Sequence, residues 1–196
     1  MGKIIALVNQ KGGVGKTTSS INLAASLGVL KRRVLLVDLD PQGNASTGIG
    51  IDKSTIKKSI YDLLLDNAEL SEAIIKTKFK NLYVIPATIN LAGADIELME
   101  KSRYEPGFSK GGQLKKYLSQ AKEMFDYIII DCPPSLGILT TNALTAADSV
   151  IIPVQCEFFA LEGIMQLINT IMLAQKNLNP TLDIEGVLLT MLDNLS

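Results

Sequence analysis

The feature that most constrains the fold of this chain is a glycine-rich loop, Lys-Gly-Gly-Val-Gly-Lys-Thr-Thr, at residues 11–18. It follows a short apolar run at residues 4–8 and precedes a helical pattern of apolar residues that begins near Lys16. Strand, glycine loop and helix in this order are the context of a phosphate-binding loop. Because glycine lacks a Cβ atom, successive backbone N–H groups can turn towards phosphate oxygens, and the helix N-terminus adds its positive dipole. The sequence therefore predicts a nucleoside triphosphate site.

Each residue of the loop is a candidate contact to the nucleotide. Lys16 would place its charge on the outer phosphates, and the Thr17 hydroxyl would ligate Mg²⁺. A lysine stands where the common form of the motif has its first glycine, and a second cation there could stabilise charge on a transferred phosphoryl group. The alternative, a glycine-rich turn with a solvated lysine, is disfavoured by the flanking strand and helix. The predicted nucleotide contacts are Lys11, Gly12, Gly13, Val14, Gly15, Lys16, Thr17 and Thr18.

Two apolar runs end in carboxylates, at Asp38 and at Asp131. The carboxyl ends of parallel strands meet at one sheet edge, which is where ligands bind in α/β folds. We therefore expect Thr17, Asp38 and Asp131 to hold Mg²⁺, with Asp131 in the role of a Walker B aspartate. The segment from Asp38 to Asn44 also reads as a turn, since it contains Asp-Pro and Gly-Asn pairs, and a turn could itself present the acid.

The residue that would orient an attacking water is less obvious. Many ATPases place a glutamate directly after the Walker B aspartate, but here Cys132 follows, and the chain has no histidine. Asp40 is the remaining acid at the predicted sheet edge, so we assign it this role. The predicted catalytic residues are thus Lys11, Lys16 and Asp40. A lone aspartate implies slow hydrolysis, which suits a switch better than a metabolic catalyst.

The rest of the chain alternates between apolar runs and helical patterns. This alternation predicts a single α/β domain over residues 1–196, with a mostly parallel β-sheet and helices on both faces. The expected strands are at residues 4–8, 33–38, 82–85, 127–131, 150–154 and 186–191. The expected helices are at residues 60–65, 70–75, 113–125, 139–147 and 161–176, and residues 102–112 read as a loop.

Composition excludes several classes of protein. Hydrophobic residues make up 47% of the chain, enough for a large core, and the net charge of -1 gives no global basic field. Cys132 and Cys156 lack the spacing of a metal site, and disulfide roles are not expected. The N-terminus has no signal-peptide pattern and no apolar stretch approaches a membrane span, so we expect a cytoplasmic protein without a membrane partner.

Two motifs resemble those of the ParA/Soj partition ATPases, a group of P-loop NTPases with a deviant Walker A loop. Asp-Leu-Asp-Pro-Gln-Gly-Asn at residues 38–44 resembles their Walker A′ motif, and Asp-Cys-Pro-Pro-Ser-Leu-Gly at residues 131–137 resembles their Walker B and switch region. The resemblance implies ATP and Mg²⁺ as cofactors and a homodimer when ATP is bound, in which Lys11 reaches the partner's nucleotide. It also implies non-specific DNA binding, hydrolysis stimulated by a ParB/Spo0J-like protein, and a nucleoid-associated location.

Three other functions stay open at this stage. A MinD-like positioning ATPase usually lacks Pro-Gln-Gly after the second acid. A small-molecule kinase or ligase, such as a dethiobiotin-synthetase-like enzyme, is disfavoured by Lys11 and by the same Pro-Gln-Gly. A non-catalytic nucleotide-binding module is the third. Members of the resembled family continue beyond the strand near Met191, so we expect a C-terminal part to be missing, including residues of the adenine pocket and a basic DNA-binding surface.

Overall fold

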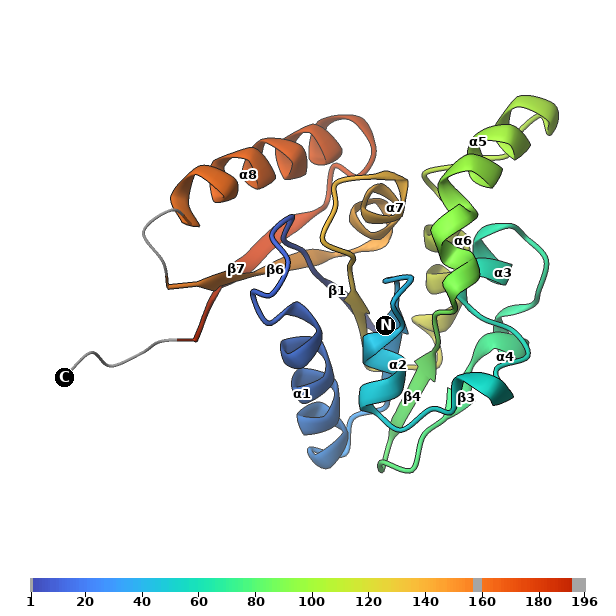
Figure 1. Cartoon of the computed structure of the whole chain (residues 1–196), viewed down its shortest axis with the longest axis horizontal. Helices are drawn as coiled ribbons and strands as arrows, with labels where there is room; N and C mark the ends of the chain where they lie inside the picture. Colours follow the sequence, from blue (N-terminus) through green and yellow to red (C-terminus); the bar gives the residue numbers. More distant parts are fainter. Residues whose placement is uncertain (1, 157–159, 192–196) are drawn as a thin grey trace.

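The computed structural model describes residues 2–156 and 160–191, and a seven-stranded sheet forms its centre (Figure 1). The strand order is β3-β4-β2-β5-β1-β6-β7, and every neighbouring pair is parallel except β3 with β4. The predicted α/β fold with a mostly parallel sheet is therefore confirmed. The strands are β1 (Lys3–Leu7), β2 (Val34–Asp38), β3 (Ile75–Lys76), β4 (Leu82–Ile85), β5 (Tyr127–Asp131), β6 (Ser149–Gln155) and β7 (Asp183–Thr190).

Helices cover both faces of the sheet, as the apolar runs of its strands require. Alternate strand residues face opposite ways, so Leu35 and Val37 join one core while Val34 and Leu36 join the other. Figure 1 shows α1 on one side and α7 and α8 on the other. The helices are α1 (Lys16–Val29), α2 (Asn44–Gly48), α3 (Ile60–Leu64), α4 (Leu70–Ala73), α5 (Ala94–Tyr104), α6 (Gln113–Ala121), α7 (Ile138–Ala146) and α8 (Ala160–Asn177), with 3₁₀ turns η1 (Lys53–Thr55) and η2 (Ile89–Gly93).

The expected elements are present, with differences at their ends and in the middle of the chain. The predicted loop over residues 102–112 is wrong at its start, because α5 continues to Tyr104. Only Ala94 and Leu98 of α5 are buried, so the helix has little apolar periodicity to detect. The predicted helix at 70–75 ends earlier, since Ile74 is extended and the next two residues form β3.

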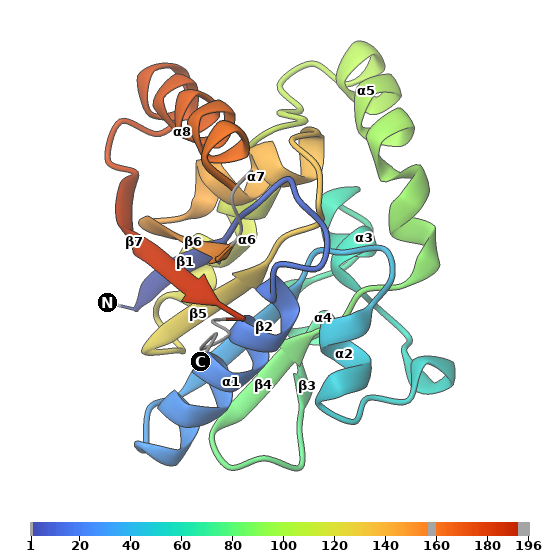
Figure 2. The ribbon, with the colours of Figure 1, turned by 60° about the vertical axis from the view of Figure 1, so that its left-hand side comes forward.

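The outer edge of the sheet is formed by β7, which Figure 2 shows lying beyond β6. Its residues are largely exposed, including Val187, Leu188 and Leu189. Within the described ranges, no helix is long and apolar enough to cross a membrane.

Candidate nucleotide-binding site

The glycine loop joins β1 to α1 at the carboxyl edge of the sheet. Gly13 and Gly15 have φ angles of 76° and 84°, in the left-handed region that glycine adopts without strain. A Cβ atom at Gly12 or Gly13 would have no neighbour within 4 Å. The space around these two glycines is thus unobstructed, as it must be in a cradle for phosphate oxygens.

Long-range hydrogen bonds hold this loop in place. The buried Asn9 side chain donates to the Pro153 carbonyl at 2.7 Å and accepts from the Lys11 N–H at 2.9 Å. The Thr190 hydroxyl, at the end of β7, donates to the Val14 carbonyl at 2.9 Å. The loop is therefore tied to β6 and β7, and a nucleotide would meet a preformed conformation.

Lys16 opens α1 with a buried side chain, 7% exposed, so the alternative of an exposed loop lysine is wrong for this residue. Its ammonium donates to the Lys11 carbonyl at 2.9 Å. Burial lowers the pKa of Lys16, and nearby negative groups, Asp131 foremost, oppose this shift. The ammonium lies inside the loop, where the phosphates of a nucleotide would lie.

Asp131 is the most perturbed carboxyl group of this site. It is fully buried at the end of β5, beside Asp38 at the end of β2. Its Oδ1 accepts from the Ser20 hydroxyl at 2.9 Å, while Oδ2 has no hydrogen-bond partner among the described residues. Burial raises its pKa to about 7 against the effect of the Thr17 and Ser20 hydroxyls, and the Asp38 charge adds to the rise. A buried carboxylate with an unpartnered oxygen near a threonine hydroxyl suits a hard cation such as Mg²⁺.

Both carboxylate oxygens of Asp38 accept hydrogen bonds from other residues of the chain. Its Oδ2 accepts from both the N–H and the hydroxyl of Ser46, each at 2.7 Å, and its Oδ1 accepts from the Asp40 N–H at 3.3 Å. Burial raises the pKa of Asp38, and the Ser46 hydrogen bonds oppose the rise. The Ser46 hydroxyl also accepts from the Ala87 N–H at 3.2 Å. These bonds position α2 and the loop before it, and the role of Asp38 as a metal ligand stays a prediction.

A cleft of about 370 Å³ lies against the glycine loop. Asp40, in the loop after β2, lines this cleft, and its Oδ1 accepts from the Gln42 N–H at 2.9 Å. Of the predicted residues, Lys11, Val14, Asp38 and Asp131 are not in the lining. The lining residues are Gly12, Gly13, Gly15, Lys16, Thr17, Thr18, Asp40, Gln42, Asn44, Pro134 and Met191.

Four of these lining residues were not predicted as site residues. Gln42 and Asn44 belong to the Asp-Pro-Gln-Gly-Asn run, and Pro134 to the run after Asp131, so the motifs pointed at their segments without giving them a role. Met191 follows β7 and carries no local signal. The arrangement as a whole can hold phosphate oxygens at the loop amides and Lys16, and the Asp40 carboxylate lines the same cleft.

Comparison of the sequence with known proteins identifies relatives of this chain. A family model described as an AAA domain matches residues 2–184. The sporulation initiation inhibitor protein Soj of Bacillus subtilis is 61% identical over 193 residues, which cover 98% of this chain and 74% of that protein. The chromosome partitioning protein ParA of Myxococcus xanthus is 53% identical over 194 residues, 99% of this chain and 66% of that protein. The chain thus spans about two thirds to three quarters of the length of these relatives.

Solved structures resemble the whole chain. Cobyrinic acid a,c-diamide synthase from Mycobacterium smegmatis, solved with bound ADP and magnesium, superposes with a TM-score of 0.92 at 42% identity. The match covers 100% of this chain and 77% of that one. The same protein has also been solved with a bound ATP analogue and magnesium.

Proposed function

This chain belongs to the ParA/Soj family of partitioning ATPases, and we propose that it is a slow, Mg²⁺-dependent ATPase that acts as a molecular switch in chromosome or plasmid partitioning. The observation that carries the proposal is the cleft that the glycine loop, Lys16 and Asp40 line together. In this reading ATP joins two subunits, the dimer binds DNA without sequence preference, and a ParB/Spo0J-like partner stimulates hydrolysis.

The residues at the cleft fit a nucleotide with Mg²⁺. The open space around Gly12 and Gly13 leaves room for phosphate oxygens. Asp131 has a buried oxygen with no partner in the described part of the chain, and Thr17 lies close enough to influence its pKa. Thr17 and Asp131 would hold Mg²⁺, with Asp38 as the further predicted ligand. When bound, the cation neutralises charge on the outer phosphates.

Within one subunit, Lys16 and Asp40 have separate roles. Lys16 holds the outer phosphates, because its buried ammonium is already directed into the loop. Asp40 is the carboxylate of the cleft that could orient a water and accept its proton. The position after Asp131 holds the buried Cys132, whose thiol pKa is raised by burial, so it supplies no base there.

Lys11 would act across the dimer. Its backbone is bonded within the loop, while its side chain is exposed and absent from the lining of its own cleft. A lysine so placed can stabilise charge at a partner's nucleotide without contributing to binding in its own subunit.

Mixing two inactive variants tests this proposal. Lys11→Ala subunits should bind ATP but not hydrolyse it, and Lys16→Ala subunits should not bind ATP. In a mixed dimer, the Lys11→Ala subunit holds ATP and the Lys16→Ala subunit offers its Lys11, so one complete site forms. We expect partial recovery of hydrolysis, measured as phosphate release with Mg²⁺, DNA and a ParB-like protein present.

The outcomes separate the parts of the proposal. Mixed dimers that form but stay inactive would show that Lys11 acts within its own subunit. Wild-type chain that binds no Mg²⁺-ATP would remove the ATPase assignment itself. Lys115→Ala is the matched control, because this exposed lysine lies on α6 and its loss should leave hydrolysis unchanged.

A ligase is the second candidate, and the likeness to the diamide synthase of Mycobacterium smegmatis favours it. Such an enzyme would consume ATP in proportion to an acceptor that becomes amidated. ATP turnover that depends on a carboxylic acid acceptor and glutamine, and not on DNA, would favour this alternative. A MinD-like positioning ATPase would instead show turnover that depends on membrane vesicles.

A further inference from the structure

We propose that Thr190 is a positioning residue of the nucleotide site. Its hydroxyl donates to the Val14 carbonyl at 2.9 Å, although the two residues lie 176 positions apart in the sequence. Figure 2 shows the end of β7, where Thr190 lies, next to the loop that precedes α1. In this proposal the hydrogen bond fixes the peptide group between Val14 and Gly15, so that the Gly15 N–H is directed at a bound phosphate. The inference rests on the proposed function, because it concerns the same cleft.

The sheet holds Thr190 in place independently of the loop. Thr190 is paired with Gln155 in the parallel ladder between β6 and β7, and its carbonyl accepts from the Cys156 N–H at 3.3 Å. The methyl group of Thr190 also lies against the loop, since a Cβ atom at Gly15 would be 3.5 Å from the Thr190 Cγ2. The hydroxyl is therefore presented to the loop by a strand of the sheet.

The peptide group between Val14 and Gly15 needs such a contact, because backbone sterics alone do not fix its orientation. Gly15 has a φ of 84°. Rotating the peptide plane by half a turn would make this φ negative, and glycine adopts both signs about equally readily. The Val14 side chain is buried in the core, which leaves the peptide plane as the part that can turn. The hydrogen bond from Thr190 selects one of the two orientations.

The selected orientation suits an anion in the cleft. The C=O and N–H groups of a trans peptide point in opposite directions, so the Gly15 N–H points away from Thr190. Gly15 lines the cleft and Thr190 does not. Among the residues that the structure describes, none accepts a hydrogen bond from the Gly15 N–H. A donor of this kind, just before the first turn of α1, is suited to a phosphate oxygen, whereas the rotated peptide would present its carbonyl oxygen and repel the phosphate.

The test measures binding to the full chain by calorimetry, with Mg²⁺-ATP and with Mg²⁺-tripolyphosphate, which has the phosphates without base or sugar. Thr190→Val removes the hydroxyl and keeps the branched shape that suits a strand. Thr190→Ser keeps the hydroxyl and removes the methyl group. We expect Thr190→Val to bind both ligands about tenfold more weakly, as for the loss of one hydrogen bond to a charged group, and Thr190→Ser to stay within about threefold of wild type.

Two further readouts separate positioning from a general loss of structure. In phosphate-release assays the loss should lie in KM, with at most about a threefold change in kcat, because the hydroxyl touches no reacting atom. In nucleotide-free protein, the amide resonance of Gly15 should coincide in wild type and Thr190→Ser and should move in Thr190→Val. If Thr190→Val does not fold, Thr190→Ala and Thr190→Ser give the same comparison, since they differ by one hydroxyl.

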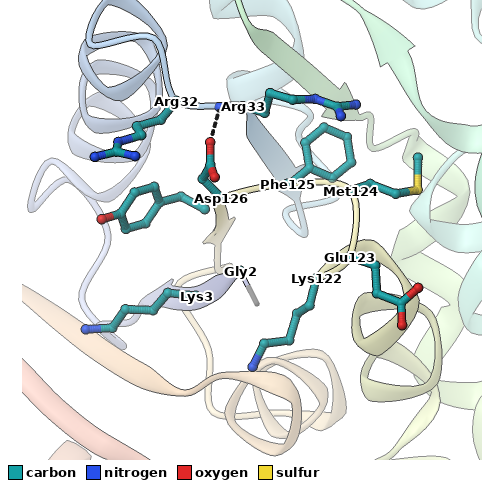
Figure 3. Close-up of a pocket in the computed structure, with 10 residues that line it drawn as sticks. Gly2, Lys3, Arg32, Arg33, Lys122, Glu123, Met124, Phe125 and Asp126 are labelled. Atoms are coloured by element: carbon teal, nitrogen blue, oxygen red, sulfur yellow. Dashed lines mark hydrogen bonds between the residues drawn. The ribbon is translucent and has the colours of Figure 1, made fainter.

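Two control variants accompany the test. Thr170→Val is the matched control, because it removes a hydroxyl that bonds only within α8. Tripolyphosphate could also bind to exposed cations far from the loop. Figure 3 shows Arg32 beside a hollow where β1, β2 and β5 begin, together with the acids Glu123 and Asp126. Arg32→Gln removes this cation, and we expect both control variants to bind both ligands within about twofold of wild type.

The outcomes distinguish this inference from the proposed function. Equal affinities of Thr190→Val and wild type for Mg²⁺-ATP would overturn the inference and leave the proposed ATPase intact. Equal losses in Thr190→Val and Thr190→Ser would assign the effect to packing of the side chain and would also overturn it. Weaker ATP binding with unchanged tripolyphosphate binding would place the effect at the base or sugar, again against the inference. Wild type that binds neither ligand would remove the proposed nucleotide site itself, and the inference with it.

Discussion

Replacing Asp131 with asparagine should make the nucleotide-free protein more stable at alkaline pH. The carboxyl group is fully buried and Oδ2 has no hydrogen-bond partner in the described residues. Burial raises its pKa from 3.8 to about 7. A raised carboxyl pKa means that the folded state binds the proton more tightly than the unfolded state. Stability is therefore lost as pH rises from about 4 to about 7, and the whole penalty is present above that range.

The size of the effect follows from the shift. A difference of about three pKa units between the folded and unfolded states lowers the free energy of unfolding by about 4 kcal/mol at pH 8. At pH 5, where the folded-state carboxyl group is still protonated, the loss is about 1.5 kcal/mol. Asparagine has no charge to bury, and its amide oxygen can still accept from the Ser20 hydroxyl. Its amide N–H₂ group lacks a partner at both pH values, so that cost of about 1 to 3 kcal/mol cancels in the comparison.

The assay is chemical denaturation of wild type and Asp131→Asn, in EDTA and without nucleotide, at pH 5 and pH 8. We expect the stability of the variant relative to wild type to improve by about 2 to 3 kcal/mol between the two pH values. Glu100→Gln, an exposed carboxylate on α5, controls for the loss of one negative charge. A relative stability that is the same at both pH values would refute the argument from burial.

Three further substitutions follow from the geometry. Asp40→Ala should keep ATP binding but slow single-turnover hydrolysis strongly, and a wild-type rate would show that another residue orients the water. Gly28→Ala should destabilise the protein by about 1 to 3 kcal/mol in urea, although alanine favours helix, because its Cβ would lie 2.7 Å from the Lys80 carbonyl oxygen. Leu189→Lys should change the free energy of unfolding by less than about 0.5 kcal/mol while reducing self-association in sedimentation, since Leu189 is 63% exposed on an edge strand.

The parts of the fold that were predictable are those with a strong local pattern. The runs that became β2 and β5 are buried on both faces, so apolar side chains occupy almost every position. The two-residue strand β3 has no such run, because it forms only where Ile75 and Lys76 pair with β4. The amphipathic signal of α5 is weak for a similar reason, as most of its residues face solvent.

The candidate site shows the same division between local and distant information. The glycine loop and Asp131 could be predicted as candidate site residues, because each belongs to a short sequence motif. The bonds that hold them could not, since the Thr190 hydroxyl that meets the loop lies 176 residues from Val14. The Ser46 hydroxyl likewise donates to Asp38 and accepts from the Ala87 N–H, and the sequence around Ser46 indicates neither contact.

The charges at the carboxyl edge of the sheet are held in an unusual way. Lys16, Asp38 and Asp131 are buried there, and burial shifts the pKa of each group in the direction that favours its neutral form. Such a site is unfavourable for the empty protein, and a ligand that carries phosphates and a divalent cation would relieve it by supplying the missing counter-charges. Nucleotide binding should therefore raise the stability of the protein markedly.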